Sequence, residues 1–362
     1  MTIPIARQYP ATDRGTESGG VPLVDSVLAQ YFEDALKRAD AMAPDYALLW
    51  QSLQAATYGG KRLRPALVLS AYAGLGGPDP AEAAEVAAAF ELLHTALVLH
   101  DDVIDRDFKR RGVPNLAGAY RSRAAGRGVP LEEAAHRGQS AAVIAGDLAL
   151  TGAYRLVAAS DLPGELRLRL LEELDAAVFA SAGGEQLDVE FSLPGRRPSL
   201  QEVLQMSRLK TAVYSFEAPL RAGALLAGAA GREVEAVGTA GRYIGTAYQL
   251  VDDLLGMFGD EELTGKSNVG DLAEGKCTPL IAYARLCPEW QELAGLLGGT
   301  PSAAEVRRAR NLLEECGARG YVEDLVECYA ARARAVLAEA ALPAALLAEL
   351  DGLLERAVQR SR

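Results

Sequence analysis

The segment from Pro80 to Asp105 constrains the fold more than any other part of this chain. Ala, Val, Phe and Leu occupy almost every position of a helical period until the segment ends in charged residues. A helix that is apolar on all sides has to be surrounded by other elements, so we expect a central helix here. The rest of the chain must then supply the apolar surfaces that cover it.

The remaining segments predict further helices and no sheet. Only 6% of the residues are aromatic, Ala and Leu supply most of the apolar content, and no sustained period-two pattern occurs. Short Gly and Pro clusters separate the runs. The most apolar further runs are Leu131 to Ser160, Glu165 to Ala182, Thr211 to Ala227 and Glu233 to Phe258, and the more charged run from Pro301 onward predicts peripheral helices. We therefore predict an all-α chain: a flexible extension over residues 1–22 and one large helical bundle over residues 23–362.

The composition excludes several classes of protein. With 49 acidic and 37 basic side chains the net charge is −12, which argues against binding nucleic acid or an acidic membrane through bulk charge. The four cysteines form no C-x-x-C pair, so we expect neither a zinc site nor a disulfide framework, and a reduced cytoplasmic setting. Residues 1–22 contain no signal-peptide run, and no uncharged apolar run of about 18 residues predicts a membrane span.

Two acidic pairs each close an apolar helix. Asp101 and Asp105 lie four residues apart, on one helical face, in a run with four carboxylates. An acidic run is usually a solvated helix end, but this one grows directly out of an apolar helix, where the carboxylates need a compensating cation. Magnesium suits them because it binds one or two carboxylates together with substrate phosphates. Asp252 and Asp253 end a second apolar helix, so we expect two metal-binding walls facing one cavity.

Basic residues occur in complementary places. One group, Lys61, Arg62 and Arg64, lies between Gly59 and Pro65, and a second, Lys109, Arg110 and Arg111, lies directly before Gly112. Three further lysines are Lys210, Lys266 and Lys276. Each alone is typical of a solvated charge, but together they match the needs of a cleft for two diphosphates. Such a cleft can expel diphosphate as a leaving group.

In sequence order these residues resemble the trans-isoprenyl diphosphate synthases (polyprenyl synthetases), particularly the actinobacterial geranylgeranyl diphosphate synthase type. The matching motifs are G-K-R-x-R-P at Gly60 to Pro65, H-T-x-x-x-x-H-D-D-x-x-D at His94 to Asp105, R-R-G at Arg110 to Gly112, K-T at Lys210 and Thr211, Q-x-x-D-D at Gln249 to Asp253, and E-G-K-x-T at Glu274 to Thr278. The resemblance implies a helical bundle of the isoprenoid synthase type with a central active-site cavity. It also implies a magnesium-dependent prenyltransferase that joins isopentenyl diphosphate head-to-tail to dimethylallyl, geranyl or farnesyl diphosphate.

The resemblance also assigns roles to individual residues. The implied metal residues are Asp101, Asp102, Asp105 and Asp252, with Asp253 supporting them and three magnesium ions present when diphosphate is bound. The implied allylic-side contacts are Arg110, Lys210, Gln249, Lys266 and Lys276, and oxygens at Lys210, Thr211 and Gln249 would stabilise the allylic cation. The implied isopentenyl diphosphate contacts are Lys61, Arg64, His94 and Arg111. A homodimer is implied as well.

One of these assignments also has support from helical geometry. His94 lies seven residues before Asp101, so both face the same way on a helix. A histidine in an apolar helix is by default a core residue, but the matches at Lys61 and Arg64 favour a ligand.

Three positions depart from the family pattern. Gly256 stands where the second acidic motif has a third Asp, which affects the expected metal affinity more than the activity. Glu185 replaces a Gln, and Val269 replaces a Gly in the loop after Lys266.

The residues before Asp101 bear on product length. In the family, an aromatic side chain four or five residues before this Asp stops elongation early, but Leu97 and Ala96 are not aromatic. We therefore expect geranylgeranyl diphosphate, with longer chains as the alternative. A terpene synthase would not need the four isopentenyl diphosphate contacts together, and a noncatalytic partner subunit would be expected to lose its acidic motifs. Only Gly256 leaves the second possibility open.

Overall fold

The computed structural model describes residues 20–359 except 111, 194, 260–271 and 274. These residues form two compact units. Unit 1 comprises residues 20–174 and Ala222–Gly228, and unit 2 comprises Asp175–Arg221 and residues 229–359. The chain changes unit within two of its helices, and each unit is described by itself below.

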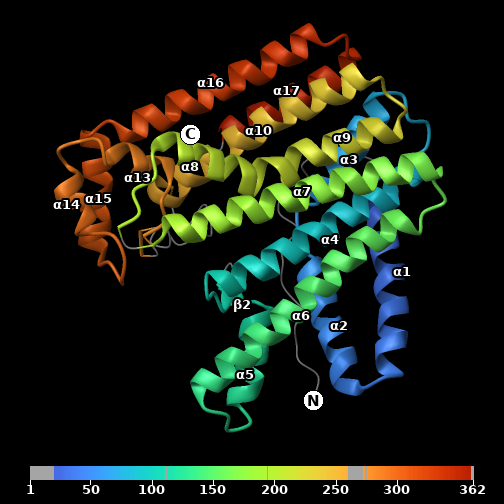
Figure 1. The fold of residues 1–362 in the computed structure, drawn as a ribbon, viewed down its shortest axis with the longest axis horizontal. Coiled ribbons are helices and arrows are strands. Elements are labelled where there is room, and N and C mark those ends of the chain that lie inside the picture. Colours follow the sequence, from blue (N-terminus) through green and yellow to red (C-terminus); the bar gives the residue numbers. More distant parts are fainter. Residues whose placement is uncertain (1–19, 111, 194, 260–271, 274, 360–362) are drawn as a thin grey trace. The chain divides into compact units, whose positions relative to one another are not determined.

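Helices make up nearly all of the regular structure (Figure 1). Unit 1 contains α1 (Val21–Asp40), α2 (Pro44–Thr57), α3 (Leu63–Gly74), α4 (Pro80–Ile104), β1 (Lys109–Arg110), β2 (Val113–Pro114), α5 (Leu116–Ala125) and α6 (Leu131–Ala158). Helices α7 (Gly164–Phe191) and α9 (Ala218–Leu226) belong partly to each unit. Unit 2 contains α8 (Leu200–Ser207), the π-helix η1 (Arg208–Glu217), α10 (Gly231–Phe258), α13 (Pro279–Ala284), α14 (Trp290–Ala294), α15 (Ala303–Glu315), α16 (Ala318–Glu339) and α17 (Ala344–Gln359). The predicted all-α class is confirmed.

Helix α4 is the core helix of unit 1, as its sequence predicts. The Asp79 side chain accepts a hydrogen bond from the Ala81 amide at the helix start, with Pro80 in the first turn. Helices α1, α3 and α6 pack around it. The α6 face is lined by buried small residues, and a Cβ at Gly146 would come within 2.3 Å of His100 Nε2. Small side chains thus allow the two longest apolar helices of this unit to approach closely.

Two helices are long and apolar enough by length and composition to cross a membrane, namely α4 and α6. In α4, 72% of the apolar window is buried inside the protein, as in the core helix of a globular domain, whereas in α6 the fraction is 44%. The sequence analysis expected no membrane span because it asked for an apolar run without any charge. In α6 that run is interrupted by Asp147.

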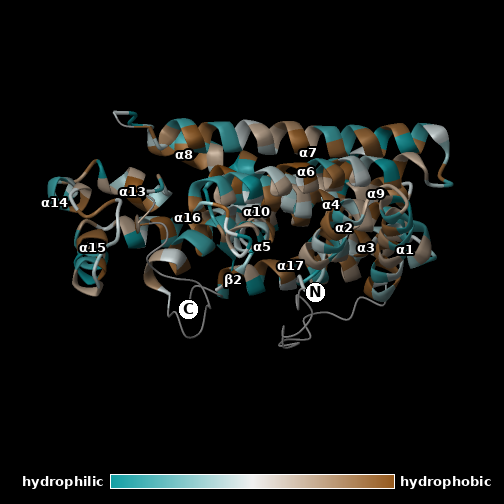
Figure 2. Ribbon diagram, turned by 90° about the horizontal axis from the view of Figure 1, so that it is seen from below, coloured by the Kyte–Doolittle hydropathy of each residue, from teal (hydrophilic) through white to brown (hydrophobic). Residues whose placement is uncertain are grey.

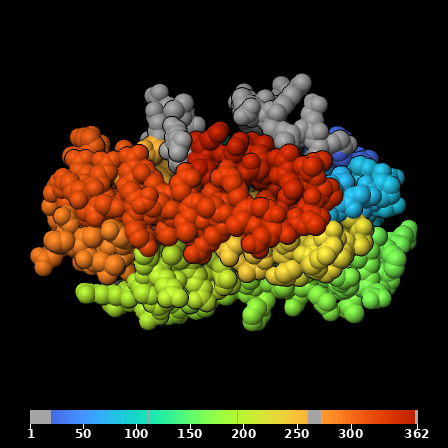
Figure 3. All heavy atoms as spheres, turned by 90° about the horizontal axis from the view of Figure 1, so that it is seen from above, coloured from blue at the N-terminus to red at the C-terminus, as the bar shows by residue number. Residues whose placement is uncertain are grey.

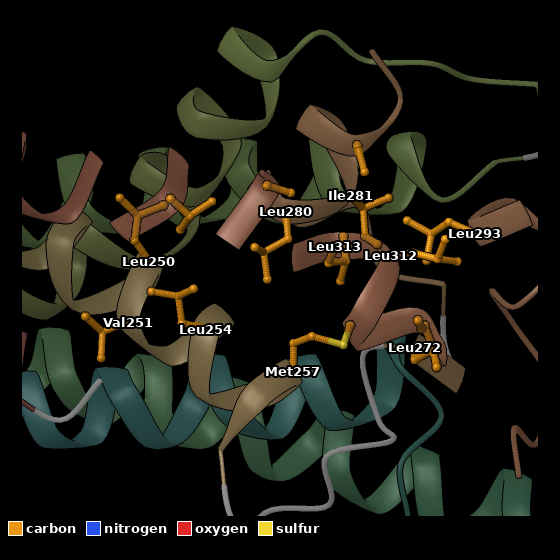
Figure 4. Close-up of a cluster of buried hydrophobic side chains, with 14 of the residues drawn as sticks. Leu250, Val251, Leu254, Met257, Leu272, Leu280, Ile281, Leu293, Leu312 and Leu313 are labelled. Atoms are coloured by element: carbon orange, nitrogen blue, oxygen red, sulfur yellow. The ribbon is translucent and has the colours of Figure 1, made fainter. Parts of the chain in front are cut away.

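The core of unit 2 lies between α10, α13, α15 and α16 (Figure 4). Leu250 and Leu254 of α10 meet Leu280 of α13 and Leu313 of α15 in a cluster whose members are at most 6% exposed. Helices α16 and α17 lie at the surface, where orange and red atoms cover much of the face in Figure 3. This agrees with the predicted peripheral position of the C-terminal helices.

Helix α7 carries hydrophilic and hydrophobic stretches that alternate along its length in Figure 2. It is longer than the predicted run from Glu165 to Ala182. Its residues Leu168 and Phe179 are 59% and 82% exposed to solvent.

Three local features differ from the sequence prediction. Helix α1 already begins at Val21, so Val21 and Pro22, which the prediction placed in the extension, are helical; residues 1–19 lie outside the described residues. The predicted single helix from Thr211 to Ala227 is instead the end of η1 followed by α9. A two-stranded ladder, β1 with β2, pairs Arg110 with Val113. The predicted single domain over residues 23–362 stays a prediction.

Candidate active site

One stripe of α4 carries predicted site residues of three kinds. His94, Leu97, Asp101 and Asp105 are half-buried, whereas Ala96 is fully buried. At 100° per residue, Leu97 lies about 40° around the helix from Asp101, and Ala96 lies about 140° away. We call His94, Leu97, Asp101 and Asp105 the α4 stripe. The structure thus separates the two predicted chain-length residues, with only Leu97 near the acidic face.

The acidic end of α4 is closed by a residue in the left-handed conformation. Arg106 has φ 58°, the Asp107 amide donates to the Asp102 carbonyl at 2.8 Å, and the Arg106 amide donates to Val103. This is the Schellman pattern, which is usually built with glycine. It ends the helix at Ile104 with Asp105 as the C-cap residue, so Asp101 and Asp102 stand on the last helical turn.

A short hairpin then brings Arg110 back to the acidic pair. Its guanidinium donates to Asp102 at 3.0 and 2.7 Å and to Asp101 at 3.2 Å. Burial raises the pKa of Asp102 above its ordinary value, although the positive charge of Arg110 opposes this shift. The structure therefore unites the predicted residues Asp101, Asp102 and Arg110 in one ion-pair cluster.

Asn115 supports this hairpin and was not singled out from the sequence. Its amide group donates to the Asp107 carbonyl at 2.9 Å, and its side-chain oxygen accepts from the Gly118 amide at the start of α5. An Asn just before a helix is an N-cap signal, so the sequence did contain the information.

The predicted basic residues of unit 1 lie at the start of α3. Lys61 is exposed, Arg64 is half-buried in the first helical turn, and Arg62 between them is buried. Arg62 is the N-cap residue of α3 with φ 53°, another left-handed residue that is not glycine. Sequence reasoning gave Arg62 no role.

In unit 2, the predicted residues Lys210 and Thr211 lie on η1. Lys210 Nζ is 3.0 Å from Glu185 and 2.7 Å from Asp188, both on α7. A Cβ at Gly184 would lie 2.2 Å from the Lys210 amide nitrogen, so glycine allows α7 to touch the backbone of η1. Glu185, noted above only as a departure from the family pattern, is thus a direct partner of Lys210.

The end of α10 carries the second acidic pair. Gln249 donates its side-chain amide to Asp253 at 2.9 Å, and Asp253 is 8% exposed. Their four-residue spacing places both on one face of α10. Asp252 is half-buried one position earlier, about 100° around the helix from Asp253. The structure therefore gives the two carboxylates different surroundings.

The loop predictions fall partly outside the described residues. Arg111, Lys266, Val269 and Glu274 are among the residues that the structure does not describe. Lys276 is described and half-buried, and its carbonyl accepts a hydrogen bond from the Thr278 amide at the start of α13.

In the described part of the chain, no group of three His, Cys, Asp or Glu side chains is arranged to hold a metal ion by itself. Asp101 and Asp105 nevertheless offer carboxylate oxygens one helical turn apart. This donor set suits magnesium, which completes its coordination with water and substrate phosphate oxygens.

Comparison with known proteins identifies the family. The model of the polyprenyl synthetase family matches residues 47–313. The geranylfarnesyl diphosphate synthase of Aeropyrum pernix is 33% identical over 318 residues, covering 87% of this chain and 94% of that protein. The geranylgeranyl diphosphate synthase of Sulfolobus acidocaldarius is 34% identical, covering 75% of this chain and 78% of that protein.

A solved structure agrees over nearly the whole chain. The geranylgeranyl pyrophosphate synthase of Corynebacterium glutamicum, complexed with isoprenyl diphosphate and magnesium, superposes with a TM-score of 0.88 at 26% identity, covering 96% of this chain and 100% of that one. The chain therefore belongs to the polyprenyl synthetase family and is a trans-prenyl diphosphate synthase, a prenyltransferase. Other relatives are named farnesyl and octaprenyl diphosphate synthases, so product length varies among its relatives.

Proposed function

We propose that this enzyme condenses isopentenyl diphosphate with allylic diphosphates, in the presence of magnesium, to give geranylgeranyl diphosphate. The α4 stripe carries this proposal. One helix face presents carboxylates for a metal at its end, an aliphatic side chain about one turn before them, and an imidazole nearly two turns before them. This order suits a substrate with a charged head and an apolar tail.

The allylic diphosphate is proposed to bind at the acidic pairs. Asp101, Asp105 and Asp252 would hold magnesium, which would neutralise charge on the leaving diphosphate. Arg110, already in contact with Asp101 and Asp102, limits the repulsion among these carboxylates before substrate arrives. Lys210 adds a cation in unit 2, held in a fixed position by two carboxylates.

The chemical step needs orientation more than a protein nucleophile. The allylic carbon–oxygen bond breaks, the isopentenyl double bond attacks the resulting cation, and the proton released from the adduct passes to the departed diphosphate. Lys61, Arg64, His94 and Arg111 would hold isopentenyl diphosphate, and oxygens at Thr211 and Gln249 would stabilise the cation. Lys266 and Lys276 complete the proposed allylic-side contacts.

Product length is proposed to depend on the side chains before Asp101. Leu97 is aliphatic and lies on the α4 stripe, so it would border the growing chain without closing the channel at farnesyl length. The finer assignment to geranylgeranyl diphosphate rests on the absence of an aromatic side chain at Ala96 and Leu97.

The test is a product assay with a matched control. Purified protein is incubated with magnesium, labelled isopentenyl diphosphate and each allylic primer, and the products are sized by chromatography. Asp101→Ala should lower turnover roughly 100-fold or more, because a metal that stabilises leaving-group charge contributes several kcal/mol. Asp45→Ala removes an exposed carboxylate of the same unit and should have no effect. Near-normal turnover of Asp101→Ala at saturating magnesium would refute the metal assignment, and product formed without isopentenyl diphosphate would indicate a terpene synthase.

We also propose a homodimer. The adjacent residues Val143 and Ile144 of α6 are 41% and 50% exposed, and only 44% of the apolar window of this helix is buried within the chain. A long apolar helix that its own chain covers to less than half suits an interface between identical subunits. Light scattering at micromolar concentration should give twice the mass of the chain, and a monomeric mass would contradict the proposal.

A further inference from the structure

A buried guanidinium belongs to the loop that joins α2 to α3, residues 58–62, which also carries Lys61. Arg62 is 7% exposed, although its neighbour Lys61 in the loop is exposed. Within the described part of the chain, Arg62 makes no hydrogen bond or ion pair with the acidic pairs, and the mechanism proposed above gives it no role. A buried arginine is retained only when its donors are satisfied, so its partners indicate its purpose.

Arg62 contacts three different elements. Its Nη1 donates to the Thr57 carbonyl and to Glu91 Oε1, each at 2.7 Å, and its Nε and Nη2 both lie 2.9 Å from Asp25. The guanidinium also lies over the Tyr58 ring, 5.5 Å from its centre. These contacts connect α1, the end of α2 and the middle of α4 through one side chain.

The contact with Glu91 joins the loop to the α4 stripe. Glu91 has a 5% exposed side chain and precedes His94 by three residues, so it lies on the adjoining turn of the same helix side. A Cβ at Gly60 would lie 3.3 Å from Glu91 Oε1, so the loop backbone also rests against this carboxylate. The positions of Lys61, Arg64 and His94 are therefore coupled through the Arg62 and Glu91 pair.

The backbone at Arg62 supports a positioning role. Its φ of 53° is uncommon for a residue with a side chain and persists only where surrounding contacts hold it. Buried ion pairs stabilise folding weakly because of desolvation, but they can specify one arrangement among several. The planar guanidinium donates in three directions at once, which a lysine ammonium on a flexible stem does not reproduce.

We propose that Arg62 is a positioning residue for isopentenyl diphosphate. It fixes the loop that carries Lys61 and the first turn of α3 against the turn of α4 that carries His94. The proposal rests on the function proposed above for these three cations, and it adds a residue that acts through them without touching the substrate.

The experiment compares Arg62→Lys with Leu312→Ala. The lysine variant keeps the charge but loses the planar donors, whereas Leu312→Ala trims a buried core residue of α15 in unit 2, which belongs to a different unit from Arg62 and its partners. Calorimetry measures the Kd for isopentenyl diphosphate, steady-state assays measure the KM for each substrate, and circular dichroism measures Tm. Arg62→Lys should raise the Kd and KM for isopentenyl diphosphate about 10-fold or more, since small misplacements of binding groups have effects of up to about 100-fold. The KM for the allylic primer should stay within about twofold of the parent value.

A second variant keeps the test decisive if Arg62→Lys fails to fold. Glu91→Gln retains an oxygen acceptor but removes the charge, so it should raise the same Kd by a smaller factor. If both variants fold, the double variant should bind isopentenyl diphosphate with the same Kd as Arg62→Lys alone, because the two residues act in one network.

The outcomes separate this inference from the proposed function. If Arg62→Lys and Leu312→Ala bind isopentenyl diphosphate equally well, the positioning role is refuted, while condensation by the parent would still support the proposed function. If the parent binds isopentenyl diphosphate without condensing it and Arg62→Lys weakens that binding, the proposed function fails and the positioning role stands. A parent that does not bind isopentenyl diphosphate would overturn the positioning role as well.

Discussion

Introducing a phenylalanine ring on α4 tests where the hydrocarbon chain of the product runs. Leu97 lies four residues before Asp101, which is about 6 Å along the helix axis, and on the same side. Ala96 lies only about 1.5 Å further along but faces into the packed core of unit 1, where it is 0% exposed. We predict that Leu97→Phe shifts products from geranylgeranyl toward farnesyl diphosphate, and that Ala96→Phe does so less, because its ring points away from the acidic face into the core.

The two variants should differ in stability. At Ala96 the ring must displace packed neighbours, which costs about 1–3 kcal/mol. Each kcal/mol lowers Tm by about 2–4 °C in a domain of about 150–250 residues. Leu97 is half-buried, so the change from Leu to Phe should cost less than about 1 kcal/mol. Leu97→Phe should therefore shorten the products with little change in Tm, and Ala96→Phe should shorten them less and lower Tm measurably.

Product chromatography and thermal unfolding are measured together on each variant. Ala83→Phe is the control, because Ala83 is fully buried on α4 but lies 18 residues, about 27 Å, before Asp101. It should lower Tm without changing the products. If neither Leu97→Phe nor Ala96→Phe changes the product distribution, the chain does not elongate along this helix and the reasoning is wrong.

Three further predictions concern separate parts of the molecule. His94→Ala should raise the KM for isopentenyl diphosphate about 10-fold, as expected when a contact of about 1–2 kcal/mol is lost, and should leave the KM for the allylic primer unchanged. Equal changes in both KM values would argue against two distinct sites. Glu185→Gln should lower the KM for the allylic primer by up to about fivefold, because Lys210 then loses one anionic partner and is more available to diphosphate. An increased KM would show that Glu185 assists binding. Burial raises the pKa of Tyr31 from 10.0 to about 12, so between these values its phenol ionises in the unfolded chain before it does in the folded one, and stability should fall as pH rises. Urea unfolding of Tyr31→Phe should show a weaker fall over this range than the parent, and parallel curves would contradict the assignment.

The elements that the sequence predicted well are those specified by periodicity and by caps. Helix α4 was predictable because its apolar residues fill every face and Asp79 and Pro80 mark its start. The acidic pairs at the ends of α4 and α10 were predictable as candidate sites because carboxylates are unusual next to apolar runs. Both signals are local in the chain.

The features that the sequence did not predict depend on nonlocal contacts. Arg62 and Arg106 adopt left-handed conformations that the sequence usually marks with glycine, and here tertiary contacts and the helix end hold them instead. The ion pairs of Lys210 require α7 to meet η1, which no local pattern encodes. Residue types therefore indicated the chemistry of the site, while packing determined which charges are already paired.

The π-helix η1 has a consequence for how this chain tolerates changes of length. Its wider turns bond each amide to the carbonyl five residues earlier, so the segment Arg208–Glu217 accommodates more residues per turn than the α-helices on either side. Deleting one residue here would let the backbone continue as an α-helix with little rotation of the later side chains, because one wide turn with the extra residue covers about the same rotation as one α-helical turn without it. Phe216, fully buried beside Gly245 of α10, would then keep its place. Inserting a residue into the flanking α-helices would instead rotate every later side chain by about 100° relative to Lys210, so this segment should tolerate a deletion better than its neighbours tolerate an insertion.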